Sequence, residues 1–229
     1  MEMLGKYQRC ISCMKEIGTN NVCPYCGYIE GSPYLPAYLP PKTVLNQRYI
    51  VGKLLSYNGE GAAYIAFDTV VEAAVEIREY MPDALCDRAA GGTAIVVNPG
   101  CETKYKALMS DFVDLMHRLT RMRTLPTVVQ AYEVFEQNNT VYAVFEHVEG
   151  GTLRQYLNEN AGEISWEQAS KLFLPLFNTL TALHASGLVH RGISPETILV
   201  NSKGEIKLNG FSISSLRAAN TELSPQLFG

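Results

Sequence analysis

Four cysteines near the N-terminus have the spacing of metal ligands. Cys10 and Cys13 are separated by two residues, nine residues follow, and Cys23 and Cys26 repeat the same spacing. Each pair lets two thiolates reach one ion from a tight turn, and two such turns fill the four positions of a tetrahedral zinc site. Because four thiolates leave no open position, the pattern predicts a structural rather than a catalytic zinc. Disulfides or a redox-active pair are the alternative interpretations.

The segment that carries these cysteines, residues 1–30, is too short to bury a core without a metal, and it resembles a zinc ribbon of two knuckles. Cys86 and Cys101 lie outside the pattern, and we expect ordinary half-buried thiols there. Residues 31–42 are rich in proline, which favours extended backbone, and predict a stiff linker lightly packed on the next domain. Docking of the linker on a partner protein is the alternative.

A second group of residues that could do chemistry lies between His190 and Val200. The run reads His190-Arg191-Gly192, then four residues, then Thr197. It resembles the catalytic loop of protein kinases, in which an aspartate at the place of Gly192 handles the substrate hydroxyl proton. An asparagine at the place of Thr197 holds magnesium in that family. The resemblance therefore implies a kinase framework that lacks its catalytic groups, with His190 in a structural role.

Other positions that this family uses for chemistry are also changed. The resemblance places Val75-Glu76-Ile77-Arg78 on the Val-Ala-Ile-Lys motif, so Arg78 replaces the phosphate-binding lysine. Leu115, or Met116 with a one-residue gap, falls where a helix glutamate should pair with that lysine. Gly210 takes the place of the magnesium-binding aspartate in the Asp-Phe-Gly motif. We therefore expect no catalytic residues and no bound magnesium-ATP.

The nucleotide-binding loop is equally degenerate. The three glycines of the family's loop correspond to Ser56, Asn58 and Gly61, of which only the last is retained. Strand alternation places Glu76 and Arg78 on one face, toward the cleft. We hypothesise that Glu76 and Arg78 fill a vestigial nucleotide cleft. The alternative is that these two positions have changed without filling the cleft. The residues of this cleft are Ser56, Asn58, Gly61, Glu76, Arg78 and Leu199.

The elements that must position these residues follow the order found in kinases. Apolar alternation and turn signals predict five antiparallel strands, and three- and four-residue spacing predicts a helix after the third. The strands are 48–55, 63–68, 73–78, 128–135 and 141–147, and the helix is 104–123. Ser165 and Gln168 predict a capping box at the start of a second, long helix that runs to about Ser186. Gly187 follows the end of this helix, and Pro175 should kink it. A small hairpin is expected at 198–200 and 206–208.

The predicted fold class is α+β, a two-lobed protein-kinase-like fold behind a zinc ribbon. The kinase-like domain covers residues 43–229, with an N-lobe to about residue 147 and a partial helical C-lobe over 148–229. The resemblance is closest to bacterial serine/threonine kinases of eukaryotic type, some of which carry an N-terminal zinc ribbon. The chain ends soon after Phe211, before the activation segment and helices that the family implies, so we expect a truncated C-lobe.

Charge and composition narrow the possible partners. A net charge of -4 with no basic run argues against nucleic acid and anionic membranes. The N-terminus has no apolar stretch of signal-peptide length, and no run of eighteen apolar residues occurs, so a cytoplasmic protein is expected.

Three hypotheses about function follow. The first is a pseudokinase, an inactive kinase-like protein that regulates or scaffolds through a protein partner. The second is an enzyme with atypical nucleotide chemistry that uses displaced groups such as Lys53, Glu72 or Glu79. The third is a truncated, nonfunctional kinase remnant.

Overall fold

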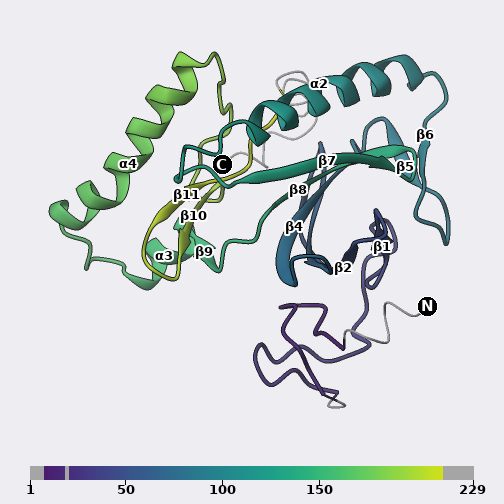
Figure 1. The fold of residues 1–229 in the computed structure, drawn as a ribbon, viewed down its shortest axis with the longest axis horizontal. Coiled ribbons are helices and arrows are strands. Elements are labelled where there is room, and N and C mark those ends of the chain that lie inside the picture. The colour runs from purple at the N-terminus through teal and green to yellow at the C-terminus, as the bar shows by residue number, and fades with distance from the viewer. Residues whose placement is uncertain (1–7, 19–20, 214–229) are drawn as a thin grey trace. The chain divides into compact units, whose positions relative to one another are not determined.

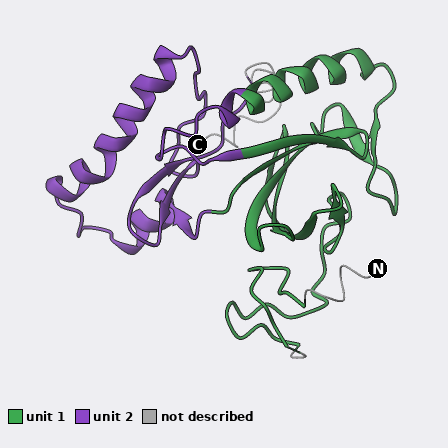
Figure 2. Ribbon diagram, viewed as in Figure 1, with its two compact units in different colours: residues 1–117, 132–147 green, residues 118–131, 148–229 purple. Residues whose placement is uncertain are grey.

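The computed structural model describes residues 8–18 and 21–213, and it divides into two compact units (Figures 1 and 2). Unit 1 comprises residues 1–117 and 132–147, and unit 2 comprises residues 118–131 and 148–229. Each unit contains its own β-sheet. Within the described part of the chain, no helix has the length and apolar character needed to cross a bilayer. The predicted domain limits at residues 30 and 42 remain predictions.

Unit 1 is built on a six-stranded sheet in the order β1-β2-β3-β4-β8-β7. Its strands are β1 (Val44–Leu45), β2 (Tyr49–Asn58), β3 (Gly61–Asp68), β4 (Ala73–Tyr80), β7 (Ala131–Gln137) and β8 (Thr140–Glu146). Helix α2 (Glu102–Thr120) begins in this unit and packs its Tyr105 and Phe112 rings against Tyr80 of β4. The five predicted strands and the helix after the third are thus confirmed, and β1 adds a sixth strand.

Three details differ from the sequence prediction. The strand expected from Val128 begins at Ala131, because Val128 and Val129 instead pair with Leu208 of unit 2. A short hairpin, β5 (Cys86–Arg88) with β6 (Ile95–Val97), was not predicted, since three-residue strands carry little periodicity. Cys86 in this hairpin is fully buried rather than half-buried.

Unit 2 contains the three-stranded sheet β11-β10-β9 and two helices. The elements are β9 (Gly150–Thr152), α3 (Leu153–Glu159), α4 (Trp166–Ala185), β10 (Ile198–Asn201) and β11 (Ile206–Leu208). The predicted capping box starts α4, with the Ser165 side chain accepting from the Gln168 amide and the Gln168 side chain accepting from Ser165. At the other end Gly187 has a φ of 69°, and Leu188 N–H donates to the Leu183 carbonyl, so the predicted glycine stop is confirmed.

The linker is more firmly packed than its proline content predicts. Leu39 is only 2% exposed and belongs to a buried cluster on one face of the unit 1 sheet. Its backbone N–H donates to the Tyr64 hydroxyl on β3, and the Ala37 carbonyl accepts from Arg88 Nε. Leu39 is therefore part of the core of unit 1, and Ala37 and Tyr38 lie against that unit at its surface.

A buried carboxylate connects this linker to the sheet. Glu79 of β4 accepts hydrogen bonds from the Tyr64 hydroxyl at 2.8 Å and the Tyr142 hydroxyl at 2.9 Å. Arg88 Nη2 lies 2.5 Å from the same carboxylate. The side chain of Arg88 is 2% exposed and that of Glu79 is 0% exposed. Arg88 Nη1 also donates to the Thr93 carbonyl. The charge of Glu79 is thus fully paired inside the unit.

We expect Glu79→Gln to lower the free energy of unfolding by about 3–5 kcal/mol, because it leaves the Arg88 guanidinium buried without its counter-charge. Urea unfolding followed by circular dichroism measures this loss. Lys171→Ala is the control, since the Lys171–Glu167 pair on α4 is 75% and 78% exposed and should contribute less than about 0.5 kcal/mol. Equal losses in the two variants would contradict the assignment.

Candidate functional site

The residues predicted to form the site fall into two groups. Unit 1 contains Ser56 and Asn58 in β2, Gly61 at the start of β3, and Glu76 and Arg78 in β4. Leu115 and Met116, the two candidates for the helix position, are both buried in α2. Unit 2 contains the other predicted residues, which are Gly192, Thr197, Leu199 and Gly210.

The loop of unit 2 is organised around the buried ring of His190, which is 1% exposed. Its Nδ1 accepts from the Gly192 backbone N–H at 3.1 Å, so Nε2 carries the proton and donates to the Asn209 carbonyl at 2.6 Å. The ring also lies 4.5 Å from the ring of Phe211, centroid to centroid. His190 thereby joins the loop to the segment after β11.

Thr197 and Gly210 fill each other's space. The Thr197 hydroxyl donates to the Gly192 carbonyl at 2.6 Å and accepts from the Ser194 N–H at 2.9 Å. A Cβ atom placed on Gly210 would lie 2.7 Å from Thr197 Cγ2 and 3.0 Å from its Cβ. The two positions at which the family carries its metal-binding asparagine and aspartate are therefore in direct contact. Space for a side chain at position 210 does not exist without movement of Thr197.

In unit 1, Glu76 and Arg78 form an internal ion pair. Arg78 Nε lies 2.9 Å from Glu76 Oε1, and the side chains are 13% and 12% exposed, in the order Arg78 and Glu76. The guanidinium carbon also lies 4.0 Å from the centroid of the Phe145 ring on β8. Positions 76 and 78 share a face of β4, as their alternation predicted. The arginine is thus held by a carboxylate from its own strand and by an aromatic ring.

The β2–β3 turn is closed by its own side chain. Asn58 Oδ1 accepts from the backbone N–H of Glu60 at 2.9 Å and from that of Gly61 at 3.2 Å. In kinases the backbone amides of this turn close over the nucleotide phosphates. A Cβ on Gly61 would lie 1.9 Å from the Glu79 carbonyl, so glycine is required there by close packing rather than by a phosphate.

The displaced groups considered for atypical chemistry do not come together. Glu79 is buried in its ion pair with Arg88. Since consecutive strand residues point to opposite faces, it lies on the other face of β4 from Arg78. Glu72 lies in the β3–β4 turn, at the opposite end of β4 from Glu79, and Lys53 lies in β2. The structure therefore does not assemble these three side chains into one site.

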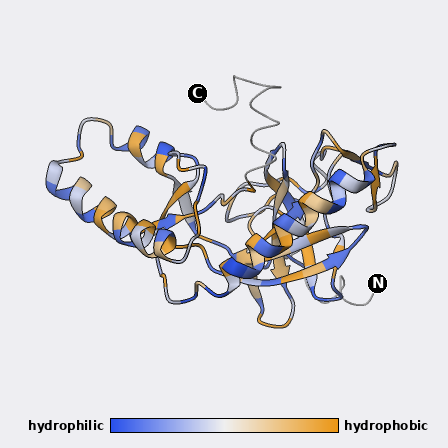
Figure 3. Cartoon of the chain, turned by 90° about the horizontal axis from the view of Figure 1, so that it is seen from above, coloured by the Kyte–Doolittle hydropathy of each residue, from blue (hydrophilic) through white to orange (hydrophobic). Residues whose placement is uncertain are grey.

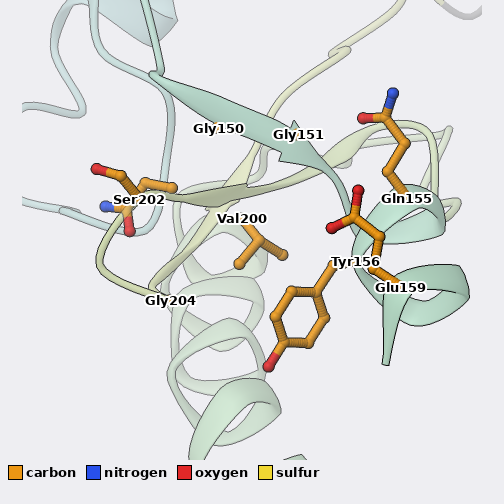
Figure 4. A pocket seen from close by; sticks show the side chains of 9 residues that line it. Gly150, Gly151, Gln155, Tyr156, Glu159, Val200, Ser202 and Gly204 are labelled. Atoms are coloured by element: carbon orange, nitrogen blue, oxygen red, sulfur yellow. The ribbon is translucent and has the colours of Figure 1, made fainter. Parts of the chain in front are cut away.

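A surface hollow of about 520 Å³ lies in unit 2, between β9, α3 and β10 (Figure 4). It is lined by Gly150, Gly151, Gln155, Tyr156, Glu159, Val200, Asn201, Ser202 and Gly204. No residue predicted for the site lines it, and it brings together a single carboxylate, Glu159, with no histidine, cysteine or arginine. The hollow does not have the composition of a catalytic centre.

The four N-terminal cysteines are gathered as their spacing predicted. Their sulfur atoms all lie within 4.8 Å of one another. The Cys10 and Cys26 sulfurs are 3.6 Å apart, and those of Cys13 and Cys23 are 3.8 Å apart. Four sulfurs bonded tetrahedrally to zinc at about 2.3 Å would be separated by about 3.8 Å. The donor set and its dimensions therefore fit a tetrahedral metal ion.

The charge of four close thiolates needs a cation beside them. Burial raises the pKa of Cys13 to about 12. Four thiolates this close together repel one another, so they can be anionic together only beside a cation. No disulfide is formed among the described cysteines.

Of the two contacts found at degenerate positions, one in each unit, only the first had a signal in the sequence. Asn58 closing its own turn was detectable in principle, because asparagine commonly accepts hydrogen bonds from backbone amides two and three residues ahead. The packing of Thr197 on Gly210 had no such signal, since the two residues are distant in sequence.

We expect one zinc ion per chain, bound by Cys10, Cys13, Cys23 and Cys26. Replacement of Cys13 by Ser should abolish stoichiometric zinc, because a structural site needs all four thiolates. Elemental analysis of the purified full chain measures this, with Cys101→Ser as the matched control that retains zinc. A metal-free wild-type protein purified under reducing conditions would contradict the expectation.

We expect Gly210→Ala to destabilise the protein more than Gly204→Ala. Both glycines have a left-handed backbone, with φ of 75° and 76°, but a Cβ at Gly204 has nothing within 4 Å. The shared backbone strain of about 1–2 kcal/mol therefore cancels, and the difference between the variants isolates the clash with Thr197. Thermal unfolding measures the difference, and Thr197→Ser should reduce it. Equal melting temperatures for the two alanine variants would refute the contact.

Comparison with known proteins supports this reading of the fold. The chain is 37% identical over 91 residues to the serine/threonine-protein kinase cds1 of Schizosaccharomyces pombe, covering 40% of this chain and 20% of that protein. It is 27% identical over 176 residues to CBL-interacting serine/threonine-protein kinase 12 of Arabidopsis thaliana, covering 77% of this chain and 32% of that protein. The chain thus spans about a third or less of the length of these curated relatives.

A solved structure, the apo form of PpkA-294, superposes with a TM-score of 0.71 at 25% sequence identity. The match covers 83% of this chain and 66% of that one. The family model described as the protein kinase domain matches residues 102–226, which is more than half of the 229 residues. On these grounds, the chain belongs to the protein kinase domain family.

Proposed function

We propose that this chain is a pseudokinase, a member of the protein kinase family that does not transfer phosphate and acts through contacts with a protein partner. The observation that carries the proposal is the contact between Thr197 and Gly210. An aspartate cannot be accommodated at position 210 while Thr197 keeps its place. As packed here, positions 197 and 210 fit each other only when position 210 has no side chain to hold magnesium.

The unit 1 residues support the same proposal. An arginine paired with Glu76 and stacked on Phe145 is less available for a phosphate than a free lysine ammonium. The Asn58 side chain already occupies the turn amides of Glu60 and Gly61. A positioned general base contributes about 10² to 10⁴-fold to such reactions, and a metal ion several kcal/mol of charge stabilisation. Loss of both leaves no efficient route for phosphoryl transfer.

A role in protein contacts is supported by the exposed side of α4. Trp166, Leu174 and Phe177 are 86%, 57% and 59% exposed, and their helical spacing places them on one side. Hydrophobic residues are frequent in this helix from Leu172 to Ala185, whereas its first turn is mainly hydrophilic (Figure 3). Exposed apolar patches of this kind mark sites of protein interaction.

The proposal predicts that neither ATP nor magnesium-ATP stabilises the protein. A ligand at a hundred times its dissociation constant adds about 2.7 kcal/mol, which thermal unfolding detects easily. We expect no change in melting temperature with millimolar ATP, with or without magnesium, and no transfer of labelled phosphate to a general protein substrate.

Two results would separate the alternatives. Magnesium-dependent phosphate transfer that Arg78→Ala abolishes would overturn the proposal in favour of an atypical enzyme. A full chain that is aggregated or lacks a cooperative unfolding transition would favour a nonfunctional remnant instead.

A further inference from the structure

The two cysteine turns of the N-terminal segment are built alike but differ at one position. The first knuckle is residues 10–15 and the second is residues 23–28. Met14 N–H donates to the Cys10 carbonyl at 2.8 Å, and Gly27 N–H donates to the Cys23 carbonyl at 2.9 Å. Both residues have left-handed backbone, with φ of 58° for Met14 and 72° for Gly27. The first knuckle therefore carries a methionine where its counterpart carries glycine.

A methionine in this conformation is strained by about 1–2 kcal/mol relative to glycine, and burial of its side chain offsets the strain. Met14 is 4% exposed and packs in a cluster with Ile50, Ile65 and Phe67 of the unit 1 sheet. Burying a methionine contributes about 1.5–3 kcal/mol. Arg9 reinforces the contact, because its guanidinium carbon lies 3.8 Å from the centroid of the Phe67 ring and its Nη1 donates to the Met14 carbonyl.

The sheet is shaped to receive this knuckle. The pairing of β2 with β3 shifts register between Val51 and Leu54, and within that shift Lys53 N–H donates to the Ile11 carbonyl at 2.8 Å. A Cβ on Gly52 would lie 2.1 Å from Met14 Cε and 2.2 Å from the Ile11 oxygen. Any side chain at position 52 would therefore displace the knuckle.

The knuckle covers the same face of the sheet as the Glu76–Arg78 pair. Residues directly opposite each other in antiparallel strands share a face. Ile65 lies opposite Glu76, and Ala63 lies opposite Arg78. Because strand residues two apart also share a face, Ile65 and Phe67 lie on this same side. The residues under Met14 and the ion pair at the degenerate lysine position are thus parts of one surface of unit 1.

We propose that the first knuckle is a metal-dependent internal cover of this sheet face. With zinc bound, the closed turn presents Met14 and the Ile11 carbonyl to β2 and β3. A turn of six residues has no core of its own to hold the strained Met14 conformation, so loss of the metal releases it. Release uncovers Ile50, Ile65 and Phe67, an apolar patch beside the Glu76–Arg78 pair. This device is independent of whether the chain transfers phosphate.

Hydrogen exchange on the full chain tests the proposal, because the Lys53 amide reports directly on its bond to Ile11. We compare the zinc-loaded protein with protein treated with a zinc chelator under reducing conditions. Chelation should speed exchange of the Lys53 amide by at least about tenfold, while the central strands β4 and β8 keep their protection. Unchanged exchange at Lys53 would overturn the proposal. Equal loss of protection in β4 and β8 would also overturn it, since the metal would then stabilise unit 1 as a whole.

Variants at position 14 separate the cover from the metal site. Met14→Gly removes the side chain and suits the left-handed backbone, so it should retain one zinc per chain but exchange at Lys53 as fast as the chelated wild type. Met14→Leu, which keeps an apolar side chain, is the matched control and should retain most of the protection. Zinc-loaded Met14→Gly with wild-type protection at Lys53 would refute the role of Met14. If Met14→Gly fails to fold, the chelation experiment decides alone.

Discussion

The carboxylate of Glu79 is the buried charge around which unit 1 is packed. It accepts from two tyrosine hydroxyls and from Arg88, and the Tyr64 hydroxyl in turn accepts from the Leu39 backbone. Burial and the neighbouring Glu79 charge raise the pKa of Tyr64 and of Tyr142, so both hydroxyls stay protonated as donors. Moving a charge out of water is costly unless it is fully paired. The linker, β3, β4, β8 and the β5–β6 hairpin are therefore held to one arrangement.

The opposite face of the same sheet carries the Glu76–Arg78 ion pair beside apolar residues. There the polar residues are Glu76 and Arg78, and the apolar residues are covered by the first knuckle. In the family this face contributes to nucleotide binding through its lysine and glycine-rich turn. Here the arginine, the turn amides and the apolar residues each have partners within unit 1. These contacts lie within unit 1, and they support the proposed role as a pseudokinase.

In unit 2, the residues at the degenerate positions also have their partners within the unit. Thr197 bonds to the Gly192 carbonyl and packs on Gly210, so three degenerate positions support one another. His190 bonds to both the loop and Asn209 and thereby preserves the loop conformation without an aspartate. The residue retained from the family motif, His190, holds the loop in place. The changed residues Thr197 and Gly210 pack against each other. A side chain restored at position 210 would therefore displace Thr197.

The sequence alone determined the family framework, because apolar periodicity, the Ser165 capping box and Gly187 are local signals that each set one element. The CxxC spacing likewise predicted that these four cysteines come together as a candidate metal donor set, since two turns of this kind can meet at one ion. Motif positions predicted which catalytic residues of the family are replaced in this chain. Only the tertiary structure decided what occupies their places: Phe145 beneath Arg78, Thr197 against Gly210, and Met14 on β2 and β3. These contacts join residues far apart in the chain, and their distances arise only when the strands and loops have packed.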